Sequence, residues 1–223
     1  MTTNEERIRI EIDGGSVSGA YARPAHPIAT VVVAHGAGAG MDHPFMSGFT
    51  DAMNERGYAT LRFNFSYVEQ GRRMPDRAPK AIATWRAVFD EAVRRSAGEP
   101  VWASGKSFGG RMASMAVAEG MPAAGLVFLG YPLHPPGKPE RIRDAHLYGI
   151  RVPMLFLQGT GDVFADAPLL DGVIERIGTP PATLERIEGA DHSFSIKGLK
   201  RTQPETAASL APSVDAFIRA HLT

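Results

Sequence analysis

The chain contains no cysteine, carries no net charge and has no long hydrophobic run. Without cysteine it can form neither a disulfide nor a thiolate metal site, and it has no thiol nucleophile. Its 24 Lys and Arg residues balance 24 Asp and Glu residues, so the basic excess that nucleic acid or an anionic membrane surface would require is missing. No apolar run approaches the roughly 18 residues of a membrane span. We therefore expect neither a nucleic-acid nor a membrane partner.

The composition is otherwise typical of a globular protein. The 223 residues are 43% apolar and 22% charged, which favours one folded domain over residues 1–223 and excludes a disordered or fibrous chain. The first six residues are polar and acidic, whereas a secretory signal is basic and then apolar, so we predict a cytoplasmic protein. Glycine is in excess, with 24 residues and no collagen-like period.

Two kinds of strand are expected from the hydrophobic pattern. Ile8, Ile10 and Ile12 alternate with charged residues, and a turn signal at 13–15 precedes a return strand at 17–21, which predicts an antiparallel hairpin. Later runs are nearly continuously apolar, as in strands that are covered on both faces of a parallel sheet. These runs cover residues 30–34, 59–63, 101–104, 125–129 and 154–157, and a further strand-like segment covers 183–187.

Helical segments alternate with these runs. They are expected at residues 44–56, 78–96, 108–119, 166–177 and 204–221. The alternation predicts right-handed crossovers and a mostly parallel α/β sheet with helices on both faces. The proline-rich segment 131–152 is long for a connection but too short for a separate domain, so no cap domain is expected.

The pentapeptide Gly105-Lys106-Ser107-Phe108-Gly109 lies between an expected strand and an expected helix. A G-x-S-x-G pattern alone is a weak signal, but this context is the one in which a sharp turn exposes a serine hydroxyl. Glycines two residues to either side would keep the turn clear of the neighbouring backbone. The alternative is a glycine-rich turn in which the serine simply caps the helix.

A serine nucleophile needs a base, and His192 is the best placed of the seven histidines. It follows the segment 183–187, and ligand-binding groups of an open α/β sheet gather beyond the ends of its strands. Asp162 follows the strand at 154–157 in the same way and could orient the base. The competing carboxylates are Asp166, which is expected to cap a helix, Asp171, and Asp191, which adjoins the base. The chain order Ser107, Asp162, His192 is that of one enzyme fold.

The glycine-rich loop 35–40 directly follows the strand at 30–34. An amide of Ala37 or Gly38 could join that of Phe108 to hold an oxyanion, and the sequence does not separate the two. A nucleotide-binding loop is the alternative, but the third glycine of the dinucleotide motif and an acidic residue after the next strand are both absent. His35 has no partners at metal-ligand spacing, so no metal site is expected.

These motifs together resemble the α/β-hydrolase superfamily, and in particular its compact, capless members of dienelactone-hydrolase type. The resemblance covers about residues 28–222, and its most specific segments are HGAGAGMDHPFM (35–46) and GYPLHPPGKPE (130–140). It implies a three-layer α/β-hydrolase fold with a Ser-Asp-His site on Ser107, Asp162 and His192. The dienelactone enzymes use a cysteine nucleophile, which this chain lacks, so their lactone substrate does not transfer to it. Some eukaryotic members of the group are thought to act as complex subunits.

The expected function is that of a serine hydrolase of esterase or carboxylesterase type. It would act on a small ester or thioester through an acyl-enzyme, with no metal or organic cofactor and as a monomer or homodimer. The alternatives are a non-catalytic interaction module that keeps the fold, and a peptidase or C–C bond hydrolase that uses the same residues. The residues expected to contact the substrate are Met41, His43, Tyr131, His134, Phe164 and Phe194.

Overall fold

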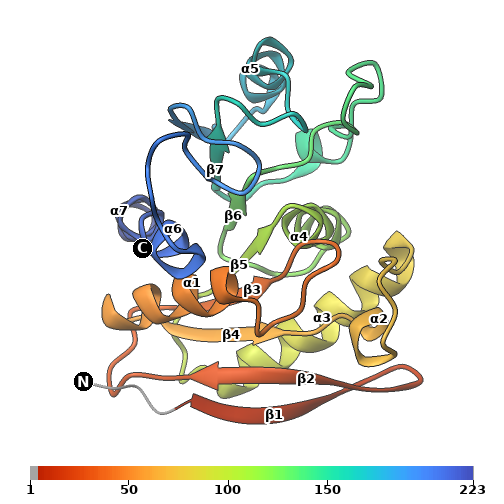
Figure 1. The fold of residues 1–223 in the computed structure, drawn as a ribbon. Coiled ribbons are helices and arrows are strands. Elements are labelled where there is room, and N and C mark those ends of the chain that lie inside the picture. Colours follow the sequence, from red (N-terminus) through yellow and green to blue (C-terminus); the bar gives the residue numbers. More distant parts are fainter. Residues whose placement is uncertain (1–4, 223) are drawn as a thin grey trace.

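In a computed structural model of the chain, which describes residues 5–222, one eight-stranded sheet has the strand order β1-β2-β4-β3-β5-β6-β7-β8 (Figure 1). The strands are β1 (Glu5–Ile12), β2 (Gly15–Ala22), β3 (Thr30–Ala34), β4 (Ala59–Phe63), β5 (Val101–Lys106), β6 (Leu126–Leu129), β7 (Met154–Gly159) and β8 (Thr183–Ile187). The last six strands pair in parallel, while β1 and β2 form the predicted antiparallel hairpin and join the sheet through an antiparallel pairing with β4. The predicted mostly parallel architecture is therefore confirmed.

Helices cover both faces of this sheet, as predicted. They are α1 (Pro44–Glu55), α2 (Ser66–Glu69), α3 (Ala78–Arg95), α4 (Phe108–Ala118), α5 (Ala167–Arg176), α6 (Gln203–Ala208) and α7 (Ala211–Ala220). One apolar core lies between the sheet and α3, α4 and α5, and a second lies between the sheet and α1, α6 and α7. Strands such as β3, in which all five residues are buried, need apolar side chains on both faces because both faces are covered. In residues 5–222, no helix has the length and apolar character that a membrane crossing requires.

The expected helix at 204–221 is wrong as a single element. The structure contains two helices there, α6 and α7, which are separated at Ser209 and Leu210. Pro212 explains the break, because a proline has no N–H to donate to the carbonyl four residues earlier and its ring clashes with that carbonyl. The four-residue helix α2 was not predicted, since one turn is too short to show a helical period.

The connection from β6 to β7 contains no cap domain. Between residues 129 and 154 the described chain contains one short 3₁₀ helix, Leu147–Gly149, and no further helix or strand. The absence of a cap domain is as predicted. The candidate site is assembled from the loops that follow the carboxyl ends of β5, β7 and β8.

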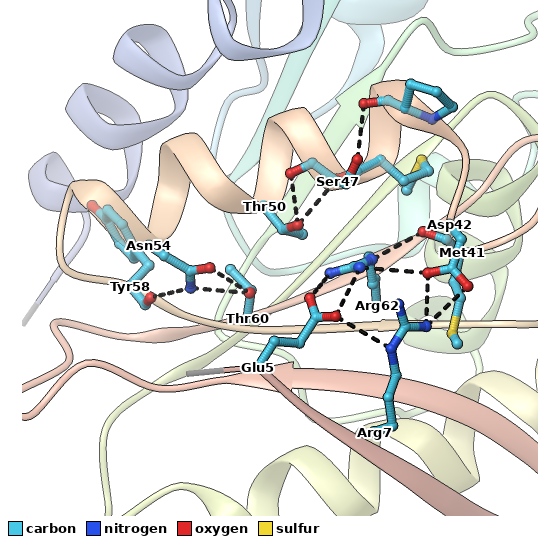
Figure 2. Close-up of polar contacts among 12 residues, drawn as sticks. Glu5, Arg7, Met41, Asp42, Ser47, Thr50, Asn54, Tyr58, Thr60 and Arg62 are labelled. Carbon is cyan, nitrogen blue, oxygen red and sulfur yellow. Dashed lines mark hydrogen bonds and ion pairs between the residues drawn. The ribbon is translucent and has the colours of Figure 1, made fainter. Parts of the chain in front are cut away.

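A buried arginine ties the loop before α1 to the sheet (Figure 2). Arg62 of β4 is only 5% exposed, and its guanidinium forms an ion pair with Glu5 of β1. The same side chain donates to the Met41 carbonyl at 3.0 Å and lies 3.5 Å from Asp42. This charge is tolerated in an otherwise apolar strand because its donors are paired, and it holds the end of the 35–43 loop against β4.

The contact between α1 and α6 gives a test of the packing. A Cβ atom on Gly48 would lie 2.4 Å from the Pro204 Cα, so the two backbones leave no room for a methyl group. We expect Gly48→Ala to lower the free energy of unfolding by about 1–3 kcal/mol in urea denaturation.

The matched control is Gly172→Ala in α5, where an added Cβ would meet no atom within 4 Å. Alanine is the better helix former, so this variant should gain about 0.5–1 kcal/mol. Equal effects of the two substitutions would contradict the close α1–α6 contact.

Candidate active site

Ser107 occupies a strained turn between β5 and α4. Its φ of 48° and ψ of −113° lie in a region that L-residues avoid. A Cβ on Gly105 would lie 2.4 Å from the Gly110 nitrogen, and a Cβ on Gly109 would lie 2.6 Å from the Ala34 carbonyl oxygen. The predicted need for glycine on both sides of the serine is therefore confirmed. The Ser107 side chain makes no capping hydrogen bond to α4, which excludes the simple N-cap interpretation.

Three side chains from three loops form one hydrogen-bonded chain at this turn. The Ser107 Oγ lies 2.8 Å from the His192 Nε2, and the His192 Nδ1 lies 2.7 Å from the Asp162 Oδ2. Since an ionised carboxylate can only accept, Nδ1 carries the proton and Nε2 is left to accept from the serine hydroxyl. The sequence analysis selected these three residues, and the structure brings them together from the ends of β5, β7 and β8.

Further donors hold the Asp162 carboxylate, whose side chain is fully buried. Its Oδ1 accepts from the Phe164 amide at 2.8 Å, and its Oδ2 also accepts from the Gln158 Nε2 at 2.5 Å. The Gln158 Oε1 in turn accepts from the Tyr131 amide at 2.8 Å. These donors replace the water that a buried carboxylate loses, so the charge can be kept beside the imidazole. Gln158 was not identified from the sequence, where it is one polar residue at the end of a strand.

The competing carboxylates are engaged elsewhere. Asp166 accepts from the Leu169 amide at 3.1 Å and caps α5, as expected. Asp191 accepts from the amides of Ser193 and Ser195, at 2.8 and 2.9 Å, and so closes the turn that contains His192. Asp171 pairs with Arg186 at the surface.

The glycine-rich loop between β3 and α1 lies against the serine. Gly36, Ala37 and Ala39 line the same cavity as Ser107, whereas Gly38 has a φ of +75° and lines a separate groove. Of the two amide donors that the sequence left open, Ala37 is therefore the one on the cavity wall.

His35 anchors this loop. Its side chain is fully buried, its Nδ1 lies 2.8 Å from the Gly36 carbonyl, and its Nε2 accepts from the Phe65 amide at 3.2 Å. Nδ1 must then be the protonated nitrogen, and both ring nitrogens are occupied within the protein. Burial lowers the pKa of His35 to about 4, so the imidazole is neutral at physiological pH. Within residues 5–222, moreover, no three His, Asp or Glu side chains gather as metal ligands.

A cavity of about 290 Å³ opens onto the serine. Its walls are formed by Gly36, Ala37, Ala39, His43, Phe45, Met46, Lys106, Ser107, Phe164, His192, Ser193 and Gln203. A larger hollow of about 440 Å³ runs beside it along residues 194–206 and contains none of the three hydrogen-bonded residues. Of these two cavities, the one at Ser107 is where a bound ligand could contact the serine hydroxyl.

Two of the six residues expected to contact the substrate, His43 and Phe164, line this cavity. The other four, Met41, Tyr131, His134 and Phe194, are at most 5% exposed and do not line this cavity, so their contact with a substrate stays a prediction. The Met41 backbone carbonyl accepts from Arg62, the Tyr131 hydroxyl donates to the Arg143 carbonyl, His134 accepts from the Asp166 amide, and Phe194 stacks on Phe45. Phe194 lines the larger hollow, and Met41 lines a separate groove. Among the wall residues that the sequence analysis did not select are Lys106, Met46 and Gln203.

A second serine–histidine pair lies further along α4. The Ser114 Oγ is 2.8 Å from the His146 Nε2, but Ser114 is fully buried and lines none of the cavities described above. Among the described residues no carboxylate contacts the His146 ring by a hydrogen bond or ion pair, and burial lowers its pKa to about 4. This pair therefore lacks both the acid and the access that the Ser107 pair has.

The sheet order, the strained serine turn and the three loop residues define an α/β hydrolase. Residues 27–219 match the family described as alpha/beta hydrolase domain, and the chain belongs to that family.

Solved structures with the same fold cover almost the whole chain. A dienelactone hydrolase from Anabaena variabilis is 18% identical, with 100% of each chain covered and a TM-score of 0.77. A lidless α/β serine hydrolase from Xanthomonas campestris is 20% identical, with coverage of 100% of this chain and 97% of that chain and a TM-score of 0.76. The esterase domain of a Rhodothermus marinus protein is 15% identical, with coverage of 97% and 98% and a TM-score of 0.75. At these low sequence identities the similarity shows a shared fold alone.

The buried His35 predicts how stability depends on pH. Its folded pKa of about 4 lies below the value of about 6.5 in the unfolded chain, so the unfolded state binds more protons between these values. Stability is therefore full above pH 6.5 and falls as the pH drops towards 4. Between pH 7 and pH 5 we expect the wild type to lose about 2 kcal/mol more than His35→Gln in urea denaturation.

The control for this comparison is His26→Gln, at an exposed histidine. It should keep the pH dependence of the wild type. A His35→Gln variant with the same dependence as the wild type would show that His35 does not titrate in this way.

Proposed function

We propose that the chain is a serine hydrolase that cleaves small carboxylic esters or thioesters through an acyl-enzyme. The observation that carries the proposal is the Ser107–His192–Asp162 hydrogen-bonded chain, whose serine opens onto a cavity. Family membership supports hydrolysis in general. The residues of the site support the reaction type.

In the first half of the reaction the Ser107 oxygen attacks the substrate carbonyl carbon. The hydroxyl proton passes to the His192 Nε2, and Asp162 stabilises the imidazolium without itself becoming protonated. The carbonyl–leaving-group bond then breaks, and His192 donates its proton to the departing alcohol or thiol. Water attacks the acyl-enzyme in the same way, its proton passes through His192 to Ser107, and the carboxylic acid is released.

The amides of Phe108 and Ala37 are the proposed oxyanion donors. Phe108 is the first residue of α4, where unpaired amide hydrogens and the helix dipole favour negative charge. Ala37 supplies the second donor from the cavity wall, in preference to Gly38. Because His35 ties this loop to the end of β4, the donor is held in place before the charge develops.

The cavity suggests the size and polarity of the substrate. A volume of about 290 Å³ is at the small end of ligand sites, and Phe45, Met46 and Phe164 give it apolar walls. We therefore propose an ester with a short acyl or alkyl group. A peptidase or C–C bond hydrolase would use the same three residues but would need room for a longer substrate.

The nucleophile is tested by replacing, one at a time, the two serines that contact a histidine, Ser107 before α4 and Ser114 within it. Ser107→Ala should lose labelling by a fluorophosphonate probe and should lower p-nitrophenyl acetate hydrolysis by about 10³-fold or more. The matched control Ser114→Ala removes a serine that also contacts a histidine, and it should keep both activities.

Labelling that persists in Ser107→Ala would overturn the assignment. A wild-type protein that is neither labelled nor active on a panel of p-nitrophenyl esters would instead favour the non-catalytic interaction module.

The acid is tested by comparing two neighbouring aspartates. Asp162→Asn presents an amide to the His192 Nδ1 and stabilises the wrong tautomer, so kcat should fall by about 10³–10⁴-fold with little change in melting temperature. Asp191→Asn keeps an acceptor oxygen for the turn and should lower kcat by less than about tenfold. If the Asp191 variant lost more activity than the Asp162 variant, the two assignments would have to be exchanged.

A further inference from the structure

Lys106, the last residue of β5, places an ammonium group directly beside the base. Its Nζ donates a hydrogen bond to the backbone carbonyl of His192. The side chain therefore links the strand that carries the nucleophile to the loop that carries the imidazole. The proposed reaction gives this group no role, either in the hydrogen-bonded chain of Ser107, His192 and Asp162 or in the glycine-rich loop 35–40 that supplies the oxyanion donor.

The same ammonium lies beside two aromatic rings. The Nζ lies 5.8 Å from the centre of the Phe45 ring and 5.3 Å from that of Phe194, and these two rings are themselves stacked at 6.1 Å. Phe194 has a φ of 62°, which is unfavourable for a bulky residue and persists only where its surroundings hold it. An ammonium beside the ring provides such a contact on the turn that begins at His192.

Lys106 also lies against the glycine-rich loop 35–40 and against Gly130, the residue after β6. A Cβ on Gly36 would lie 3.5 Å from the Lys106 Cγ, so the aliphatic part of the lysine side chain packs on the glycine-rich loop 35–40. A Cβ on Gly130 would lie 3.4 Å from the Lys106 Nζ and 3.5 Å from the His192 Nδ1. Gly130, the residue after β6, thus lies next to both the ammonium and the imidazole.

We propose that Lys106 is a positioning residue, which fixes the His192–Phe194 turn and thereby aims the imidazole at Ser107. This inference rests on the proposed function of His192 as the base. The hydrogen bond holds the His192 backbone, and the two rings hold the ammonium, so the turn cannot rotate away from β5. A displacement of about 1 Å at a catalytic group can cost about 100-fold in rate.

The charges around Lys106 agree with this role. Burial lowers its pKa to about 8, while the carboxylates of Asp162 and Asp191 act in the opposite direction. The protonated form is therefore the main one at pH 7, and it has the donors and the charge that the contacts require.

The test compares two substitutions at this position. Lys106→Met keeps an unbranched side chain beside the two rings but cannot donate to the His192 carbonyl, whereas Lys106→Gln retains a donor. On p-nitrophenyl acetate we expect kcat of Lys106→Met to fall by about 10- to 100-fold, with KM changed by less than about twofold. Lys106→Gln should recover much of this loss. Lys197→Met, at an exposed lysine of the same loop, is the control and should resemble the wild type.

A second measurement does not depend on turnover. The proton shared by the His192 Nδ1 and Asp162 gives a far-downfield ¹H resonance, which should weaken or broaden in Lys106→Met and persist in Lys106→Gln. If the wild type neither hydrolyses esters nor reacts with the fluorophosphonate, the proposed function fails, but this resonance still tests the positioning of His192.

Three outcomes would overturn the inference. Wild-type kinetics and an unchanged resonance in Lys106→Met would show that the turn does not need the ammonium. A raised KM with kcat unchanged would make Lys106 a substrate-binding residue instead. Equal losses in both variants, accompanied by a lower melting temperature, would assign it to stability alone.

Discussion

The close approach of the β5–α4 turn to its neighbours is the constraint on which the site depends. Ser107 is held at a positive φ, and this is possible only because Gly105 and Gly109 let the backbones of α4 and β3 come nearer than any Cβ would allow. The strain is offset by the surrounding packing of a sheet that is covered on both faces. As a result of this strain the Ser107 hydroxyl points away from the helix and towards His192, whereas an unstrained serine at this position would cap the helix.

Each loop around that hydroxyl is fastened by a buried or half-buried polar side chain from the sheet or its edge. His35 and Arg62 hold the glycine-rich loop, Gln158 holds the acid, and Lys106 contacts the loop of the base. Apolar packing alone would leave these loops free to shift, because dispersion contacts have little directional preference. Hydrogen bonds to loop carbonyls, amides and carboxylates specify both distance and angle.

The two serine–histidine pairs of α4 show that environment decides what such a pair can do. Both have an oxygen–nitrogen distance of 2.8 Å. The Ser107 pair has a buried carboxylate behind the histidine and a cavity in front of the serine. In the Ser114 pair the serine is fully buried, and partial burial lowers the pKa of the histidine to about 4. A hydrogen bond between these residue types is therefore no sufficient sign of a nucleophile.

The sequence by itself determined the sheet, the hairpin and the three loops that could carry chemistry, because continuous apolar runs, glycine positions and chain order are local properties. It could not place Tyr131, His134, Met41 or Phe194, since whether a loop side chain faces a cavity depends on what covers it from distant parts of the chain. It also missed Gln158 and Lys106, whose partners lie on other strands or loops. The division of the last expected helix into α6 and α7 follows from Pro212, which the sequence analysis had placed inside a single helix. Only the tertiary structure separated Ala37 from Gly38, because the direction of a glycine-rich loop is set by its buried anchors and not by its composition.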